Sequence, residues 1–525
     1  MKIRASFSLP VLELVLLITA SSLSSRIYNP FVWSTYKEFS HIYSITMDME
    51  KVYFGTDQGI LRFNRIKQEW DIPITGSNGF KGSKAEIIAV DPVFNKLWII
   101  SDQSLSVYND QISLWEREIP RISIALSTIT SIGFTYDTIF LEGNEGIYAS
   151  PRGSYIWEHY SGIIPSTTKW FGKKAKLSVT DYPFLTPYYA TDEYFNKYEY
   201  AAIAIESKDM WLGTNQFGVF YYNTFTWNGI HYVTGLANER VDAIYRDEDH
   251  YWIGGIYGTN KGITSMNFVT GEGKHWRSDD VYGISSDNVY AITGTENAVW
   301  IGTSAGLLRY DKNGNTWKSY TQLNGLVDNT VTALHIKNDT LFIGTAGGFC
   351  LMVLRSKNMV TLESFDNVRI YAFATFLGDL VIATERGVYL WRKKAFEPIT
   401  DPDGDLTFGV TALFVDKNAI WFGTRRKGID VYYPDSTRWE EFLPPTTIRG
   451  ESVYAISGNQ YYVWIGTNNG VSRYNKKTKA WTSFTKMDGI ADNEVRAILV
   501  EDDCLWLGTK NGLTCFRYTD PSVPP

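Results

Sequence analysis

Short turns that pair aspartate with asparagine recur along the 525-residue chain and form its most regular set of polar side chains. A ring of such side chains on one face of a repeat protein could bind a sugar or a cation. The alternative is that Asp and Asn hydrogen-bond their own backbone and fix the turn. Recurrence in every clear repeat favours this structural alternative, because a binding site rarely needs all repeats. The candidate residues are Asp287, Asn288, Asp328, Asn329, Asp492 and Asn493.

An aromatic-rich segment at about 162–196 is the second candidate, because it interrupts an otherwise regular spacing. Aromatic side chains with few aliphatic neighbours suit stacking on sugar rings or contact with a protein partner. The alternative is a pair of strands packed on the domain, with the aromatic side chains buried beneath it. Insertions into repeat arrays often carry function, so we expect a ligand to contact this segment or the turns above. Its candidate residues are Trp170, Phe171, Tyr182, Tyr188 and Tyr189.

Patterns typical of catalysis or metal binding are missing from the sequence. The six histidines occupy unrelated positions in the repeat, and no pair has metal-ligand spacing. No Gly-x-Ser-x-Gly nucleophile motif or phosphate-binding loop occurs. We therefore expect no cofactor, no metal and no catalytic residues. A polysaccharide lyase or glycoside hydrolase stays open as the alternative, since carboxylates from distant repeats can meet at one site without any spacing signal.

Eleven copies of one pattern must position these candidates: an aromatic residue, an aliphatic residue, glycine and threonine. Successive copies are separated by roughly 40 residues, except for one interval that holds about 35 extra residues and contains the aromatic segment. A period of this length with a repeated aromatic residue predicts stacked four-stranded units. The copies lie at Phe54, Trp98, Phe140, Trp211, Trp252, Trp300, Phe342, Val381, Trp421, Trp464 and Trp506.

One repeat shows why each unit should be a sheet. Residues 495–500 alternate as an inner strand, 505–507 form a short apolar strand, and 513–518 form a third strand. Asn511-Gly512 suits the hairpin between them, because both residues can take positive φ. A small sheet of this kind cannot bury both faces alone. The units must therefore pack against one another, which predicts an all-β fold of the β-propeller type over 30–520.

The two ends of the chain predict how the array closes. Residues 33–39 read as a fourth strand without the first three, whereas the last unit stops after its third strand. We therefore expect 33–39 to complete the last sheet. Eleven repeats exceed the roughly four to eight blades of one propeller. Two rings are expected, with the earliest and the last sheets sharing one of them, and one large ring is the alternative.

The first 25 residues differ in composition from the rest of the chain. Lys2 and Arg4 precede a mostly apolar run at 7–19, and small residues follow at 20–25. This order is typical of a cleaved secretory signal peptide. An uncleaved anchor is the alternative, but the apolar run is short against the roughly 20 residues of a membrane span. The mature chain is expected in the periplasm or outside the cell, with no integral membrane segment.

Charge and cysteine content narrow the possible partners. The net charge of −7 is spread evenly along the sequence without a basic stripe, which argues against nucleic acid as a partner. A hydrophobic content of 44% is ample for a large core. Cys504 and Cys515 lie on adjacent strands but diagonally, so we expect reduced thiols there, and Cys350 has no evident partner.

The repeat itself resembles a known family. The stretch WIGTNNGVSRYNKKTKAWTSFTKMDGIADNEVRAI at 464–498 is similar to the two-component regulator propeller repeat, and 300–333 matches it as well. The resemblance covers nearly the whole mature chain and is strong from Trp211 onward. It implies an extracytoplasmic β-propeller of the kind that serves as the sensor of hybrid two-component receptors, often binding breakdown products of polysaccharides. A related use is in bacterial surface-secretion machinery.

Two function classes follow. No kinase or transmembrane part follows the repeats, so only the binding half of the resemblance is expected to apply, with a separate signalling or secretion partner. The first class is an exported binding or scaffold protein that recognises a glycan or a protein through a ring face or the insertion. The second is the polysaccharide-degrading enzyme. Close-set carboxylates at the centre of the fold, one with a raised pKa, would favour the enzyme.

Overall fold

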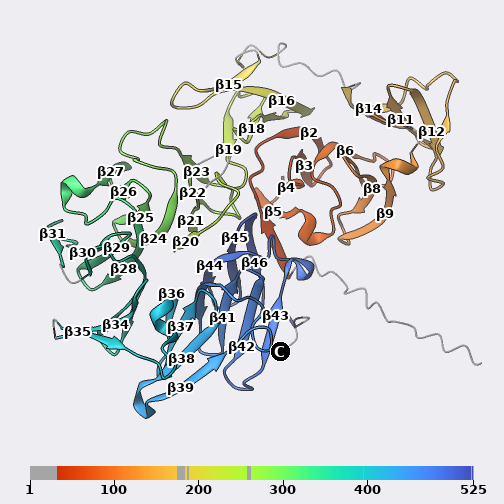
Figure 1. Ribbon diagram of the computed structural model, residues 1–525. Helices are drawn as coiled ribbons and strands as arrows, with labels where there is room; N and C mark the ends of the chain where they lie inside the picture. Colours follow the sequence, from red (N-terminus) through yellow and green to blue (C-terminus); the bar gives the residue numbers. More distant parts are fainter. Residues whose placement is uncertain are drawn as a thin grey trace, which may run out of the picture.

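A computed structural model describes residues 32–124, 126–173, 182, 184–185, 188–256, 262–362, 365–393, 395–521 and 523. Throughout this part the fold is all-β, with antiparallel sheets of mostly four strands following one another along the chain (Figure 1). The all-β class that the sequence predicts is confirmed, and the four-stranded antiparallel sheets are consistent with a β-propeller. The leader expected at 1–25 lies outside the described residues.

Seven sheets of the described chain, drawn green to blue in Figure 1, contact one another in chain order through their inner strands. The inner strand β44 of the last of them also contacts β20 of the first. The strands are β20(Ala243–Asp247), β21(His250–Gly254), β22(Ile263–Met266), β23(Gly273–Trp276), β24(Val289–Thr295), β25(Ala298–Thr303), β26(Gly306–Asp311), β27(Thr316–Tyr320), β28(Val331–Lys337), β29(Thr340–Thr345), β30(Gly348–Val353), β31(Met359–Thr361), β32(Ile370–Phe376), β33(Asp379–Thr384), β34(Gly387–Arg392), β35(Ala395–Ile399), β36(Val410–Val415), β37(Ile420–Thr424), β38(Ile429–Tyr433), β39(Arg438–Phe442), β40(Val453–Gly458), β41(Tyr462–Thr467), β42(Gly470–Asn475), β43(Trp481–Phe484), β44(Val495–Val500), β45(Leu505–Thr509) and β46(Gly512–Phe516).

Four sheets of the described chain form a second group, drawn red to yellow-green. Their inner strands contact in the order β16, β2, β6 and β10. The strands are β2(Ile42–Met47), β3(Lys51–Thr56), β4(Ile60–Asn64), β5(Glu69–Ile74), β6(Ala85–Val90), β7(Leu97–Ser101), β8(Ser104–Asn109), β9(Leu114–Pro120), β10(Ile129–Phe134), β11(Thr138–Gly143), β12(Gly146–Pro151), β13(Glu158–His159), β14(Lys169–Gly172), β15(Tyr189–Thr191), β16(Lys197–Glu206), β17(Asp209–Thr214), β18(Val219–Asn223) and β19(Gly229–Tyr232).

The expectation that the earliest and last sheets share one ring is wrong in its grouping. Inner strand β2 contacts β6 and β16, whereas β44 contacts β40 and β20. The chain therefore leaves the larger group after β1(Trp33–Tyr36), builds the four-sheet group, and then returns. The long interval between the third and fourth repeats lies inside the smaller group, because the sheets on either side of it both belong there.

The glycine of the repeated pattern permits the close approach of neighbouring sheets. A Cβ atom at Gly302 would lie 2.8 Å from the side chain of Val331 in the next sheet. At Gly508 the same atom would lie 2.7 Å from Val241, which directly precedes the first sheet of the larger group. Any larger side chain at these positions would force the sheets apart. The glycine signal in the sequence thus reports sheet-to-sheet packing.

The threonine of the pattern fixes the hairpin that follows it. Thr303 Oγ1 donates to the backbone oxygen of Gly306 at 2.8 Å, and Thr509 makes the same bond to Gly512 at 2.8 Å. Both glycines have positive φ, 129° and 114°, which other residues adopt only with strain. The pattern's aromatic residue completes the unit, since Trp300 and Trp464 are fully buried between sheets.

Strand β1 completes the last sheet, as predicted from the chain ends. It pairs antiparallel with β46 from Trp33 opposite Phe516 to Tyr36 opposite Leu513. The rings of Trp33 and Phe516 stack at 3.9 Å between centroids. The strand is shorter than the expected 33–39. The three cysteines are buried and unpaired, which agrees with the expected reduced thiols.

Short 3-10 helices follow several outer strands and shape the turn before the next inner strand. In η5, Thr321 and Asn324 form a reciprocal capping box, and Gly325 ends the helix with a φ of 105°. The Asn-Gly and Asp-Gly steps of the sequence thus mark these helix ends. The described helices are η1(Gly76–Asn78), η2(Arg121–Ser123), η5(Gln322–Asn324), η7(Asp405–Phe408), η8(Pro434–Ser436) and η9(Lys486–Asp488).

Candidate functional site

The described parts of the aromatic insertion extend the two end sheets of the four-sheet group. Strand β14 pairs with inner strand β10, and β15 pairs with inner strand β16. The expected alternative was a single strand pair. The two strands instead join different sheets, β14 before and β15 after the segment that lies partly outside the described residues. Both additions lie on the inner edge of their sheet.

Several aromatic residues of the insertion are used for packing. Phe171 lies against the apolar cluster between the β6 and β10 sheets, and Trp170 contacts Phe140 on the opposite face of β14. Tyr182 and Phe184 pack on a cluster that covers the outer face of the β16 sheet. An end sheet would otherwise expose an apolar face to water. The insertion therefore caps both ends of the group, which accounts for much of its aromatic content.

The recurrent Asp and Asn side chains are engaged in their own turns. Asp287 accepts hydrogen bonds from the backbone and hydroxyl of Ser278, both at 2.7 Å. Asn329 Oδ1 accepts from the backbone of Gln322 at 2.9 Å. Side-chain oxygens of Asp328, Asp492 and Asn493 likewise accept hydrogen bonds from the backbone N–H groups of Thr330, Glu494 and Lys486, respectively. Asn288 lies beside Asp287, part-buried and with a partner of its own. The structure thus favours the turn-fixing alternative for this set.

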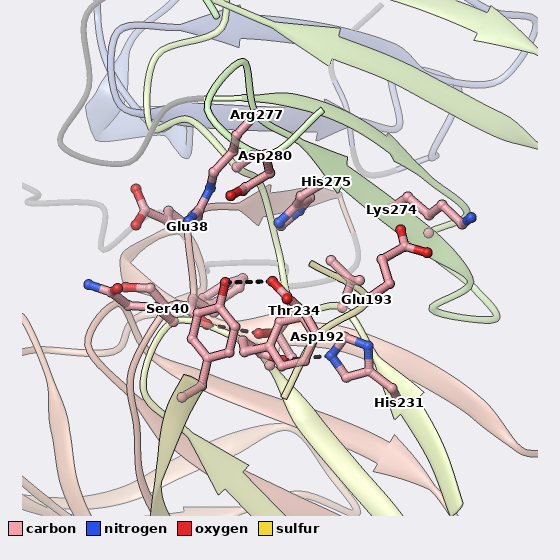
Figure 2. A pocket seen from close by; sticks show the side chains of 18 of the residues that line it. Glu38, Ser40, Asp192, Glu193, His231, Thr234, Lys274, His275, Arg277 and Asp280 are labelled. Atoms are coloured by element: carbon pink, nitrogen blue, oxygen red, sulfur yellow. Dashed lines mark hydrogen bonds between the residues drawn. The ribbon is translucent and has the colours of Figure 1, made fainter. Parts of the chain in front are cut away.

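A cavity of about 380 Å³ lies where the insertion, the four-sheet group and the seven-sheet group meet; we term it the junction cavity (Figure 2). The linker between β1 and β2 contributes Glu38 and Ser40 to its wall. The end of the insertion contributes 191–194, and β23 with the loop after it contributes His275 and Asp280. Residues far apart in the sequence therefore share one wall. Its volume falls in the range of ligand pockets, roughly 300–1000 Å³.

Two histidines in this cavity present hydrogen-bond acceptors. His231 Nε2 lies 2.6 Å from the backbone oxygen of Phe217, and His275 Nε2 lies 3.2 Å from that of Gly235. A carbonyl oxygen only accepts, so Nε2 carries the hydrogen in both rings and Nδ1 is left as an acceptor. Burial lowers the pKa of His231, and it lowers the pKa of His275 to about 4. Both rings are therefore neutral at pH 7.

Aromatic and charged groups complete the junction cavity. Tyr198 stacks on Phe217 at 4.4 Å between centroids, and Phe217 lies 4.2 Å from the ring of His231. Asn196 Nδ2 donates 3.0 Å bonds to Asp192 and to Asp280, which joins the two groups of sheets. Burial raises the pKa of Asp192, but its hydrogen bonds from Asn196 and neighbours outweigh this and lower the pKa. Neutral acceptors, aromatic rings and carboxylates thus converge here.

A larger cavity of about 1430 Å³ lies among the inner strands of the four-sheet group; we term it the inner-strand cavity. Trp170, Phe171 and Tyr188 of the predicted set line it, and the side chain of Tyr188 is mostly exposed. Tyr182 packs on the outer face as described above. Tyr189 lies on β15, with the ammonium of Lys197 4.6 Å from its ring centre. The inner-strand cavity thus gathers part of the predicted set.

The wall of the inner-strand cavity carries both charge signs. Lys84 pairs with Glu86 at 2.6 Å and lies 5.9 Å from the ring centre of Tyr43. Burial raises the pKa of Asp102, but hydrogen bonds from Ser83 and the backbone of Lys84 outweigh it, so the pKa is lowered. Asp102 therefore stays ionised at neutral pH. These side chains are occupied with one another rather than poised as an acid and base pair.

A carboxyl with a raised pKa occurs elsewhere in the molecule. Asp430 on β38 faces Glu441 on β39, and Asp430 is only 5% exposed. Burial, together with the nearby carboxylates of Glu441 and Asp401, raises the pKa of Asp430 to about 7. A hydrogen bond with Asp403 raises the pKa of Glu441. This cluster lies on the third and fourth strands of one sheet and lines neither cavity, so it does not supply the central acid pair that an enzyme would need.

We expect Asp430→Asn to stabilise the folded protein at pH 8. The pKa of Asp430 is higher in the folded chain than its ordinary 3.8, so at pH 8 the folded state holds an ionised, buried carboxylate. Removing that charge should raise the free energy of unfolding by about 3 kcal/mol at pH 8. The gain should shrink as the pH falls and vanish near pH 4, where Asp430 is protonated in the folded state. Denaturant midpoints at both pH values measure this. The exposed Asp502→Asn should change neither midpoint, and an equal gain at both pH values for Asp430→Asn would contradict the account.

The part of the chain that the structure describes contains no group of three or more His, Cys, Asp or Glu side chains arranged to hold a metal ion. It also contains no helix with the length and hydropathy of a membrane span.

Comparison with known proteins places the fold. No family model matches the chain, and no curated protein matches it. PorZ, a surface component of the type IX secretion system of Porphyromonas gingivalis, is similar in structure with a TM-score of 0.53 and 12% identity, over 93% of this chain and 87% of PorZ.

Extracellular domains of two-component-system proteins from B. thetaiotaomicron are also similar in structure. That of BT3049 has a TM-score of 0.47 and 17% identity, over 92% of this chain and 63% of that domain. That of BT4673 has a TM-score of 0.47 and 15% identity, over 92% of this chain and 76% of that domain. Proteins of the kind that the repeat resembles are thus among the structural neighbours. The chain spans less than two thirds of the BT3049 domain, and the likeness concerns the fold.

Sequence reasoning missed the junction cavity. His231 and His275 occupy the same position in successive repeats, the third residue of the fourth strands β19 and β23, each in a Gly-x-His-aromatic stretch. The expectation that the histidines occupy unrelated positions in the repeat is therefore wrong for this pair. Glu38 lies within 33–39, which the sequence assigned to closure of the last sheet and not to a site. Asp192, Tyr194 and their neighbours at the end of the insertion were within the segment expected to contact a ligand. The broken repeat spacing and the shared Gly-x-His-aromatic stretch were therefore the two pointers to this place in the sequence.

Proposed function

We propose that this protein is an exported binding protein that recognises a glycan end in the junction cavity. The observation that carries the proposal is the convergence of two neutral histidines, stacked aromatic rings and carboxylates from three chain segments. Sugar hydroxyl groups donate to such acceptors and accept from N–H groups, and a sugar ring packs on aromatic side chains. The volume of about 380 Å³ suits a terminal sugar unit or two.

The two groups of sheets are proposed to act as two bodies that meet at this site. The seven sheets form one closed ring, since β44 contacts β20, and the four sheets form an open ring capped by the insertion. The junction cavity lies between the two. Ligand binding there would hold both bodies in one arrangement, which a separate signalling or secretion partner could read. The mixed lining of the inner-strand cavity suits a longer part of the same glycan.

Export is part of the proposal. The leader at 1–25 has the charged, apolar and small-residue order of a cleaved signal peptide. PorZ, described as a bacterial surface component, shares the fold. N-terminal sequencing of the native protein should find a start close to 20–25, and an intact Met1 in a cytoplasmic fraction would contradict export.

A glycan array followed by titration calorimetry tests the binding function. We expect at least one neutral oligosaccharide to bind, and His275→Phe to weaken it by about tenfold or more, because phenylalanine keeps the ring but removes the acceptor. Binding should also weaken as the pH falls through about 4, where His275 becomes protonated. His335→Phe is the matched control, since His335 is part-buried and bonded to Thr375 outside the cavity.

Three outcomes would count against the proposal. One is an array without a binder. Another is equal weakening by His335→Phe, which would indicate a general loss of stability. The third is a glycan affinity that His275→Phe leaves unchanged but Tyr188→Ala abolishes. That result would assign the glycan to the inner-strand cavity.

A further inference from the structure

Ten of the arginines that the structure describes pair with a carboxylate of the same chain. The short pairs include Arg65 with Asp209 at 2.7 Å and Arg246 with Glu501 at 2.6 Å. Such pairing is expected on a protein of net charge −7, where carboxylates are plentiful. The other paired arginines are Arg62, Arg152, Arg240, Arg309, Arg355, Arg392, Arg438 and Arg496.

Five further arginines lie together on three consecutive sheets of the larger group. None of them has a carboxylate within ion-pair distance among the described residues, and four of the five are exposed. They lie in the loops that lead into inner strands β32 and β40 and in the hairpins β33–β34 and β37–β38. We term them the arginine surface. Its members are Arg369, Arg386, Arg425, Arg426 and Arg449.

Hydrogen bonds and ring contacts show that these loops adjoin one another. The backbone oxygen of Arg369 accepts from the backbone of Glu385 at 3.0 Å, which places the hairpin of Arg386 beside it. The guanidinium carbons of Arg369 and Arg425 lie 5.8 and 5.2 Å from the ring centre of Tyr371. Arg425 also donates to the hydroxyl of Tyr371.

The same contacts continue into the third sheet. The backbone oxygen of Arg425 accepts from Ser452 Oγ at 2.8 Å, and Ser452 lies in the loop that leads into β40. That loop also carries Arg449. The surface is therefore continuous across the three sheets. Three exposed carboxylates, Asp366, Glu385 and Glu451, share these loops with the five arginines.

The chemistry of the surface favours a peptide over a sugar. A sugar needs a free aromatic face, but the ring of Tyr371 is flanked by Arg369 and Arg425. The nearby Tyr454 ring is covered by Arg496 at 4.3 Å. What the surface offers is a row of guanidinium donors, each of which can hold a carboxylate through two hydrogen bonds. Arginine and tyrosine are also the residues enriched in protein interfaces.

We propose that the arginine surface docks an acidic segment of a partner protein. The inference is independent of the junction cavity, which lies between the two groups of sheets and shares no residue with this surface. A run of Asp or Glu side chains in an extended segment would supply a carboxylate to each guanidinium. Docking would then depend strongly on salt, because the pairs are exposed.

Fluorescence polarisation with the full chain tests the proposal. The probe is a labelled decapeptide of alternating glutamate and glycine, and the matched probe has glutamine in place of glutamate. We expect the glutamate peptide to bind at low salt and the glutamine peptide not to bind. The double variant Arg369→Gln with Arg425→Gln should weaken binding by about tenfold or more.

The control removes the same charge elsewhere. Arg355→Gln with Arg392→Gln takes away two arginines that already pair with Asp339 and Asp379, and it should change affinity by less than about twofold. If both double variants weakened the affinity for the glutamate peptide equally, net charge alone would explain the loss, and the proposal would be overturned. Absence of peptide binding at low salt would also overturn it. So would a polygalacturonate fragment that binds while the peptide does not, because the surface would then recognise an acidic glycan.

Discussion

A truncated chain that begins at Lys37 is expected to unfold far more easily than the full mature chain. The truncation removes β1, whose residues Trp33, Ser34 and Thr35 are all buried in the last sheet. Trp33 packs face to face on Phe516, and β46 loses its pairing partner. Burial of one large aromatic side chain is worth about 3–5 kcal/mol, so the loss should exceed 5 kcal/mol with the strand pairing included.

Denaturant midpoints and hydrogen exchange measure this loss. Exchange should accelerate first in β46 and β45, because they become the edge of an incomplete sheet. A chain that begins at Tyr28 is the control, since it keeps β1 and should match the full mature chain. Equal midpoints for the two truncations would show that β1 does not close the larger group.

Trp464→Ala is expected to destabilise the protein by about 3–5 kcal/mol, the cost of replacing a fully buried aromatic side chain by alanine. Trp464 is fully buried and contacts the rings of Phe484, Phe516 and Tyr518. The cavity left behind would lie between the last two sheets, where the neighbouring strands cannot collapse without losing their register. The measurement is again the shift in denaturant midpoint at neutral pH.

Trp227→Ala serves as the matched control for that substitution. Trp227 is 60% exposed and touches only the ring of Phe184 among the described aromatic contacts. Its replacement should cost less than about 1 kcal/mol. If both tryptophan variants shifted the midpoint equally, the repeated aromatic residue would not be the anchor of the sheet packing described above.

The repeated pattern allowed most of the fold to be predicted, because each of its residues has one local task. Gly302 permits close sheet packing, Thr303 fixes the hairpin, and Trp300 fills the space between sheets. The closure by Trp33 was also predictable, since a lone fourth strand and a missing fourth strand complement each other. The grouping of sheets was not, because it depends on contacts such as that of Gly508 with Val241, which no sequence spacing reveals.

The candidate site was predictable only in part. The broken spacing pointed to the insertion, and its end does border the junction cavity. The aromatic content was a weaker guide, because Trp170 and Phe184 are used to cover the outer faces of the end sheets. His231 and His275 share one position in the repeat, but their approach could not be predicted, because they belong to different groups of sheets. Arg369 and Arg425 likewise gather only when neighbouring loops adjoin.

A crystal structure of the mature protein with the tightest glycan from the array is the most direct test of the central claim. The account predicts sugar density in the junction cavity, with hydroxyl groups within hydrogen-bond distance of the Nδ1 atoms of His231 and His275. Density confined to the inner-strand cavity, or to the loops around Asp287, Asp328 and Asp492, would contradict it.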